Sequence, residues 1–180
     1  MLIQTYQSGW VADFEQLKSA LHKAVGAVAT GIEHVGSTAV PQLAAKPIID
    51  IDMTYEAPET FGRIKARLEK TGYRHGGDQG IPGREVFKRN LLKEPVPILD
   101  TISHHLYVCQ LGSGELERHL AFRDFLRNHE KERQEYERLK YEIAAQANQD
   151  RKAYARLKEV LARDFIEAIL KNILKDRWHD

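Results

Sequence analysis

The most informative stretch of the chain reads EHVGSTAVPQLAAKPIIDID and spans residues 33–52. Its end, 48–53, is apolar and β-branched, which predicts a strand. Because strand side chains alternate between faces, Asp50 and Asp52 should project from one face, open to solvent and within a metal ion's width of each other. Magnesium binds one or two carboxylates together with substrate phosphates. The pair therefore predicts a metal site for phosphate chemistry, with Mg²⁺ as first choice and Mn²⁺ or another divalent ion as the alternative.

A Gly-Ser turn precedes that strand. Gly36 and Ser37 follow a strand-like segment, 32–35, and open a helix-prone one, 38–45. Glycine lets the backbone approach an anion closely, and free N–H groups at a helix start favour phosphate. The twelve residues between Ser37 and Asp50 suffice for a short helix to cross back. We therefore expect a phosphate cradle beside the carboxylates, with Thr38 and Lys46 as further nucleotide contacts.

Two later motifs accompany this block: His-Leu-Tyr-Val at 105–108 and Phe-Arg-Asp-Phe-Leu-Arg at 122–127. Together with the segment from His34 to Ile51, they resemble the GrpB family of the nucleotidyltransferase superfamily, and the likeness covers nearly the whole chain. The resemblance implies a small mixed sheet in which strand, Gly-Ser turn, helix and Asp-x-Asp strand form a nucleotide and metal site. The family has no settled activity to carry over. Related domains occur fused to dephospho-coenzyme A kinase, which implies a nucleotide-linked role, including one in coenzyme A metabolism.

The chain departs from these patterns at two places. Gln42 stands where the family usually has glycine, which predicts a slightly different turn. The superfamily usually supplies a third carboxylate from a later strand, but the matching segment, 103–110, offers His105 and Tyr107 on one face and no acid. Asp100 lies just before that segment, too early by spacing to match the position that His105 occupies. His105 is therefore the predicted substitute, as base or ligand, in a catalytic set with Asp50 and Asp52.

Several basic and imidazole side chains have two interpretations. Arg84 follows a glycine-rich loop, 76–83, and is predicted either to contact phosphate or, with Lys88 and Arg89, to mark a solvated edge strand. Arg123 either reaches the active face or pairs with Asp124 or a helix end. A histidine on a strand, such as His34, is more often hydrogen-bonded than a ligand, although a His-Asp-Asp set would suit zinc, manganese or nickel.

Composition limits the number of domains, the partners and the location that the chain can have. The chain has 180 residues, enough for one domain with its own core, and its 27 basic and 26 acidic side chains leave a net charge of +1. That balance argues against nucleic acid as a partner. Cys109 cannot form an internal disulfide and is predicted to be a buried, inert thiol. No stretch reaches membrane-spanning length, so we expect a cytoplasmic protein, and a homo-oligomer stays open.

The predicted organisation is a single α/β (α+β) domain, 1–180. Its first part, 1–112, contains a nucleotidyltransferase-like small mixed sheet with flanking helices, and its second, 113–180, is a C-terminal helical extension. Apolar residues recur at helical spacing in the ranges 10–25, 59–71, 116–128, 131–148 and 150–175. A strand, loop and strand are expected across 73–89, and a proline-broken connection across 90–100.

Two functions follow from this sequence. The first is a metal-dependent nucleotidyltransferase that moves a nucleotidyl group from a nucleoside triphosphate to an unknown acceptor. The second is a noncatalytic nucleotide- or metal-binding module that kept the phosphate cradle and lost turnover. The third-acid position separates them: an additional carboxylate within metal reach favours the enzyme, whereas His105 alone favours the module.

Overall fold

Five strands form one mixed sheet in the order β1-β2-β5-β4-β3. The computed structural model describes residues 1–90 and 95–175, and confirms the predicted α/β class. The strands are β1 (Gly31–Val35), β2 (Ile49–Tyr55), β3 (Tyr73–His75), β4 (Arg84–Arg89) and β5 (His104–Gln110). Strands β2 and β5 pair in parallel, and the other neighbours are antiparallel. The Asp-x-Asp strand thus lies next to the strand that carries His105.

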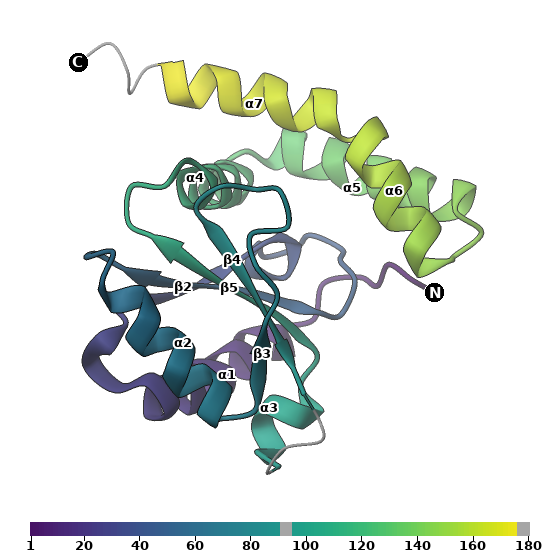
Figure 1. Cartoon of the computed structure of the whole chain (residues 1–180). Coiled ribbons are helices and arrows are strands. Elements are labelled where there is room, and N and C mark those ends of the chain that lie inside the picture. Colours follow the sequence, from purple (N-terminus) through teal and green to yellow (C-terminus); the bar gives the residue numbers. More distant parts are fainter. Residues whose placement is uncertain (91–94, 176–180) are drawn as a thin grey trace.

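Helices cover both faces of this sheet (Figure 1). Helices α1 (Gly9–Val25) and α2 (Thr60–Lys70) lie on one face, with the short α3 (Pro97–Thr101) near its end. Helix α4 (Gly114–Asn128) crosses the opposite face and carries α5 (Glu130–Gln146), α6 (Arg151–Leu161) and α7 (Arg163–Lys175). Short 3-10 turns, Gly26–Val28 and Ser37–Ala39, complete the described part. The predicted helical extension therefore forms a layer above the sheet.

Because side chains alternate along β2, the two faces of this strand point toward different helical layers. Ile49, Ile51 and Met53 point toward α1 and α2 and enter a core that contains every buried residue of the α1 stripe. Asp50 and Asp52 consequently point toward α4. A second apolar cluster, including Leu43, Tyr136 and Tyr154, joins the segment before β2 to the C-terminal helices. The site lies between these two cores.

Two predicted helices differ in the structure. The segment 38–45 is a single 3-10 turn followed by irregular chain, because Val40 is extended and Pro41 follows it. Tertiary contacts hold this segment instead: Glu137 accepts the Ala44 N–H, and Lys140 donates to the Ala44 carbonyl. Gln42 adopts φ 64, in the left-handed region that glycine favours.

The predicted helix 150–175 is two helices that meet at Ala162. Helix α6 packs on α5 and α7 packs on α4, and one straight helix could not follow both neighbours. Residues 91–94 of the predicted connection lie outside the described residues. Within 1–90 and 95–175, no helix has the length and apolar character needed to cross a membrane.

Candidate functional site

Asp50 lies where the Gly-Ser turn, β2 and β5 meet. Residues Asp50 and His105 are register partners on the parallel strands, and the His105 Nδ1–H donates to Asp50 Oδ1 at 2.8 Å. The other carboxylate oxygen packs on Gly36, where an added Cβ would lie 2.3 Å from Oδ2. Gly36 has φ 72 and ψ −170, a conformation essentially restricted to glycine. Asp50 remains 31% exposed and lines a cavity.

Asp52 shares the face of Asp50 but is completely buried, so the expectation that both carboxylates face solvent is wrong. Helix α4 lies over it, and His119 Nδ1–H donates to Asp52 Oδ2 at 2.8 Å. Burial raises the pKa of Asp52, and the hydrogen bond from His119 opposes that rise. The remaining oxygen, Oδ1, is buried and has no hydrogen-bond partner among the described residues.

The sequence analysis did not single out His119. Its Nε2 lies 3.2 Å from Glu115 Oε1, so the ring sits between two carboxylates. Burial disfavours the imidazolium, but the hydrogen bonds and charges of Asp52 and Glu115 outweigh burial and raise the pKa of His119 to about 9. The sequence signal was present: Glu115 and His119 are four residues apart on a predicted helix, which places them on one face.

The Gly-Ser block separates into ligand-facing and structural members. Gly36, Ser37 and Thr38 line the cavity. The Thr38 hydroxyl is already engaged, because it lies 3.0 Å from His34 Nε2 and donates to the Ile48 carbonyl. His34 stacks on Phe14, and burial lowers its pKa to about 4. His34 is therefore a neutral structural residue, and Ser37 is the block's available hydroxyl.

The candidate cationic side chains also fall into two groups, those that line the cavity and one that is structural. Lys46, Arg84 and Arg123 all line the cavity. Arg84 lies over the Tyr107 ring at 4.7 Å and near Glu115, at 3.6 Å. Arg123 donates to Glu33, Asp124 and the His34 carbonyl. It therefore both lines the cavity and pairs with Asp124, the two roles predicted for it. Arg89 instead pairs with Asp100 and donates to the Thr71 carbonyl, which makes it structural.

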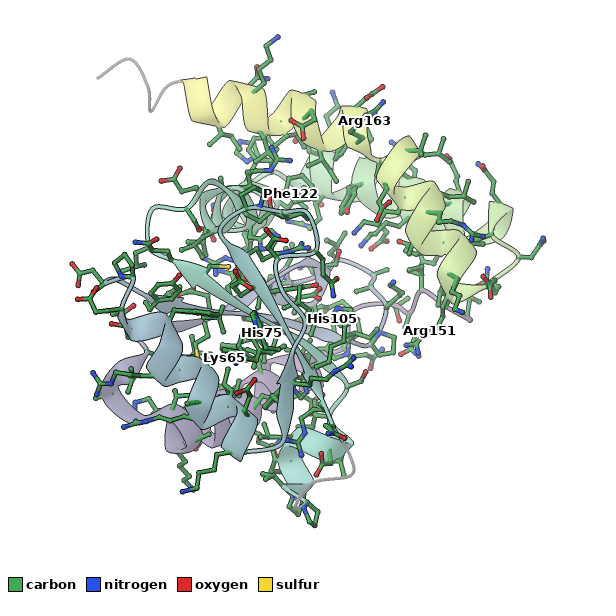
Figure 2. The ribbon with its side chains drawn as sticks, in the orientation of Figure 1. Lys65, His75, His105, Phe122, Arg151 and Arg163 are labelled. Atoms are coloured by element: carbon green, nitrogen blue, oxygen red, sulfur yellow. The ribbon has the colours of Figure 1, made fainter. Side chains whose placement is uncertain are left out.

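The cavity measures about 530 Å³ and lies between the sheet and the C-terminal helices. In Figure 2, the labelled His105 belongs to the sheet, whereas Phe122 and Arg163 belong to the helical layer above it. The cavity is lined by the polar groups around Asp50 and by aromatic and aliphatic side chains of the helices, namely Phe122, Leu126, Tyr136, Tyr154, Ile166 and Leu170. Such a mixed lining suits an organic ligand that carries charged groups.

The carboxylates do not fit a divalent ion that both would share. One observation favours a cation, namely the unpartnered Asp52 Oδ1. Against it, His119 holds Asp52 Oδ2, and Asp52 does not line the cavity. Within 1–90 and 95–175, no group of three histidine, cysteine or acidic side chains could hold a metal. A magnesium ion held by Asp50 together with ligand phosphates stays a prediction.

Comparisons with known proteins agree with this fold. The GrpB protein family model matches residues 1–172. A glutamate-rich protein GrpB from Alkalihalophilus pseudofirmus is 30% identical over 96% of this chain and 95% of its own. The UPF0157 proteins YqkA of Bacillus subtilis and PA4798 of Pseudomonas aeruginosa are 35% and 37% identical, over 78% and 86% of this chain.

The chain spans less than two thirds of those two UPF0157 proteins, 39% of YqkA and 62% of PA4798. A crystal structure of GrpB from Enterococcus faecalis superposes with a TM-score of 0.78 at 32% identity, covering 98% of this chain and 99% of that one. The whole described architecture, including the helical layer, is thus similar to that of the solved protein. This chain belongs to the GrpB family.

Proposed function

We propose that the chain is a noncatalytic module that binds a nucleotide in the cavity between the sheet and the C-terminal helices. The observation that carries the proposal is the composition of that one cavity. It joins Gly36, Ser37 and Asp50 to an excess of cationic over acidic side chains. The cations are Lys46, Arg84, Arg118, Arg123, Lys140, Lys158 and Arg163, and the acids are Asp50, Glu115, Glu159 and Glu167. A phosphate group suits this charge, and the aromatic lining suits a base.

The environment of the two carboxylates supports binding over transfer. A transferase of this fold would use both carboxylates with a cation, whereas here each is paired with an imidazole. No acid stands at the position of the missing carboxylate, since His105 occupies it and donates to Asp50. Glu115 lies on the far side of the His119 ring from Asp52. Each carboxylate of the pair thus already has a histidine donor, and Asp52 Oδ1 is left without a partner among the described residues.

Isothermal titration calorimetry tests the proposal with ATP, AMP and dephospho-coenzyme A, each in EDTA and again with Mg²⁺. We expect saturable binding in EDTA. In parallel, labelled nucleoside triphosphates are incubated with the protein, Mg²⁺ or Mn²⁺, and a cell extract as acceptor source. Incorporated label would replace the binding module with the metal-dependent nucleotidyltransferase. Failure of all three ligands to bind would reject the nucleotide proposal.

The Asp50→Asn variant separates the two functions by the sign of its effect. Without a metal, Asp50 repels ligand phosphates, so its neutralisation should tighten ATP binding about threefold. With a metal, removal of the carboxylate charge should weaken ATP binding, because the ion loses a ligand. Asparagine retains an acceptor for the His105 N–H. Glu15→Gln, at an exposed acid on α1 that does not line the cavity, is the control and should leave ATP binding unchanged.

A further inference from the structure

Three lysines from separate segments line the helical end of the cavity. Lys46 follows the Gly-Ser block, Lys140 lies on α5 and Lys158 on α6. We call them the lysine cluster. In the part of the chain covering 1–90 and 95–175, the ion pairs within 4.0 Å include none of the three. Every cavity-lining arginine, by contrast, has a carboxylate partner.

Two buried tyrosines hold these ammonium groups in place. Lys46 Nζ lies 4.8 Å from the centroid of the Tyr154 ring, and Lys140 Nζ lies 5.0 Å from that of Tyr136. Lys158 hydrogen-bonds the Tyr136 side chain, and Lys140 also donates to the Ala44 carbonyl. Cation–π and hydrogen-bond contacts orient a lysine without neutralising its charge. The cluster is thus ordered, and no carboxylate among the described residues forms an ion pair with it.

The charges around the cluster are unfavourable without an anion. Burial lowers the pKa of Lys140 and of Lys46, and the nearby Lys158 charge lowers both further, whereas Tyr136 raises the pKa of Lys158 and keeps it charged. The other ionisable groups that act on the three lysines are Asp50, Tyr136, Glu137, Arg151 and Tyr154. Like charges brought together in a partly buried space cost free energy, which an anion among them would recover.

We propose that Lys46, Lys140 and Lys158 form a polyphosphate subsite that receives the di- or triphosphate group of the ligand. The inference rests on the proposed nucleotide-binding function, because it assigns the phosphate end of the same cavity. Lysines from three segments can act on several phosphates of one chain, Lys46 and Lys158 by contact and the fully buried Lys140 by its charge. Lysine binds phosphate as a point charge, without the planar geometry that arginine requires.

The test measures binding of inorganic tripolyphosphate by calorimetry in EDTA. Lys46→Met and Lys158→Met each remove one ammonium and keep an unbranched apolar side chain. Lys152→Met is the matched control, since Lys152 is exposed on the same helix as Lys158 and does not line the cavity. We expect each cluster variant to weaken tripolyphosphate binding roughly tenfold, and the control to bind like wild type. Equal affinity in all three variants would overturn the subsite.

Comparison with ATP separates this inference from the proposed function. Tripolyphosphate binding that depends on the cluster, together with no binding of ATP, rejects the nucleotide and keeps the polyphosphate subsite. ATP binding that survives both cluster variants keeps the nucleotide and rejects the subsite. Thermal unfolding of each variant verifies that the variant is folded.

Proton uptake by the wild-type protein on binding provides a second measurement, which needs no variant. An anion among the lysines favours their charged forms, so binding should raise the lowered pKa values of Lys46 and Lys140 and take up protons. Calorimetry at pH 8.5 in HEPES and in Tris, which differ in ionisation enthalpy, detects this uptake. Tripolyphosphate affinity should accordingly fall as pH rises. Binding to wild type without proton uptake would overturn the placement of the anion among these lysines.

Discussion

The carboxylate pairs on the sheet and the lysine cluster on the helical side differ in how their charges are balanced. Asp50 and Asp52 each accept a hydrogen bond from a histidine. Lys46 and Lys140 lie over tyrosine rings, Lys140 also donates to a backbone carbonyl, and Lys158 hydrogen-bonds the Tyr136 side chain, with no acid within ion-pair distance of the three among the described residues. On the sheet side each carboxylate therefore has a histidine donor, although Asp52 Oδ1 has no partner among the described residues, whereas the helical side leaves positive charge for a ligand.

This difference separates stability from binding. Groups that satisfy one another in a buried space contribute to the folded state, and losing one member leaves the other unpaired. Groups left uncompensated contribute little to stability and act mainly on a ligand. We therefore expect substitutions on the sheet side to lower the free energy of unfolding and substitutions in the lysine cluster to change affinity.

Gly36→Ala should have the largest effect. The added Cβ would lie 2.3 Å from Asp50 Oδ2, and the backbone at φ 72 is unfavourable for any residue with a side chain. Strain and overpacking together should lower the free energy of unfolding by about 4 kcal/mol, measured by urea denaturation. Gly62→Ala in α2 is the control, because nothing lies within 4 Å of its Cβ position, and it should stabilise by about 0.5 kcal/mol. Equal effects would show that the Asp50 contact is not tight.

His119→Ala should rank next and exceed His105→Ala. Loss of His119 leaves a completely buried Asp52 without its donor, which should cost about 3 kcal/mol of unfolding free energy. His105 is 50% exposed and its partner Asp50 is 31% exposed, so that substitution should cost less than about 1 kcal/mol. Adding Asp52→Asn should recover part of the His119→Ala loss. Absence of coupling between Asp52 and His119 in this double-mutant cycle would contradict the buried pair.

The pH dependence of stability should report His119. Its pKa is about 9 in the folded protein against an ordinary value of 6.5, so its contribution is complete below pH 6.5 and is lost as pH rises through 9. The difference in unfolding free energy between wild type and His119→Gln should shrink by up to about 3 kcal/mol across that range. The comparison with His119→Gln is needed because the lowered pKa of Lys140 makes the stability of both proteins change with pH in the opposite direction. A difference that is constant with pH would refute the charged imidazole.

Lys46→Met should have the smallest effect on stability. It loses the contact with the Tyr154 ring but relieves repulsion from Lys158, so the free energy of unfolding should change by no more than about 0.5 kcal/mol. The same variant should weaken tripolyphosphate binding. A large loss of stability would show that the lysine cluster is structural, like the carboxylate pairs.

Much of the fold was predictable because it depends on local periodicity. The stripe of apolar residues from Trp10 to Val25 predicted α1, and its members are buried as expected. The β-branched run predicted β2, and strand alternation placed Asp50 and Asp52 on one face. The prediction failed at 38–45, where helix propensity was overridden by Pro41 and by contacts to Glu137 and Lys140, which lie over ninety residues away in sequence.

The sequence by itself determined the periodic elements, the family and the Asp-x-Asp pair, because these depend on neighbouring residues. Only the tertiary structure decided that Asp50 opens to a cavity while α4 buries Asp52 beneath His119. It alone brought Lys46, Lys140 and Lys158 to one end of that cavity. Burial and charge balance depend on which distant segments pack together, and the spacing of residues along the chain does not encode those distances.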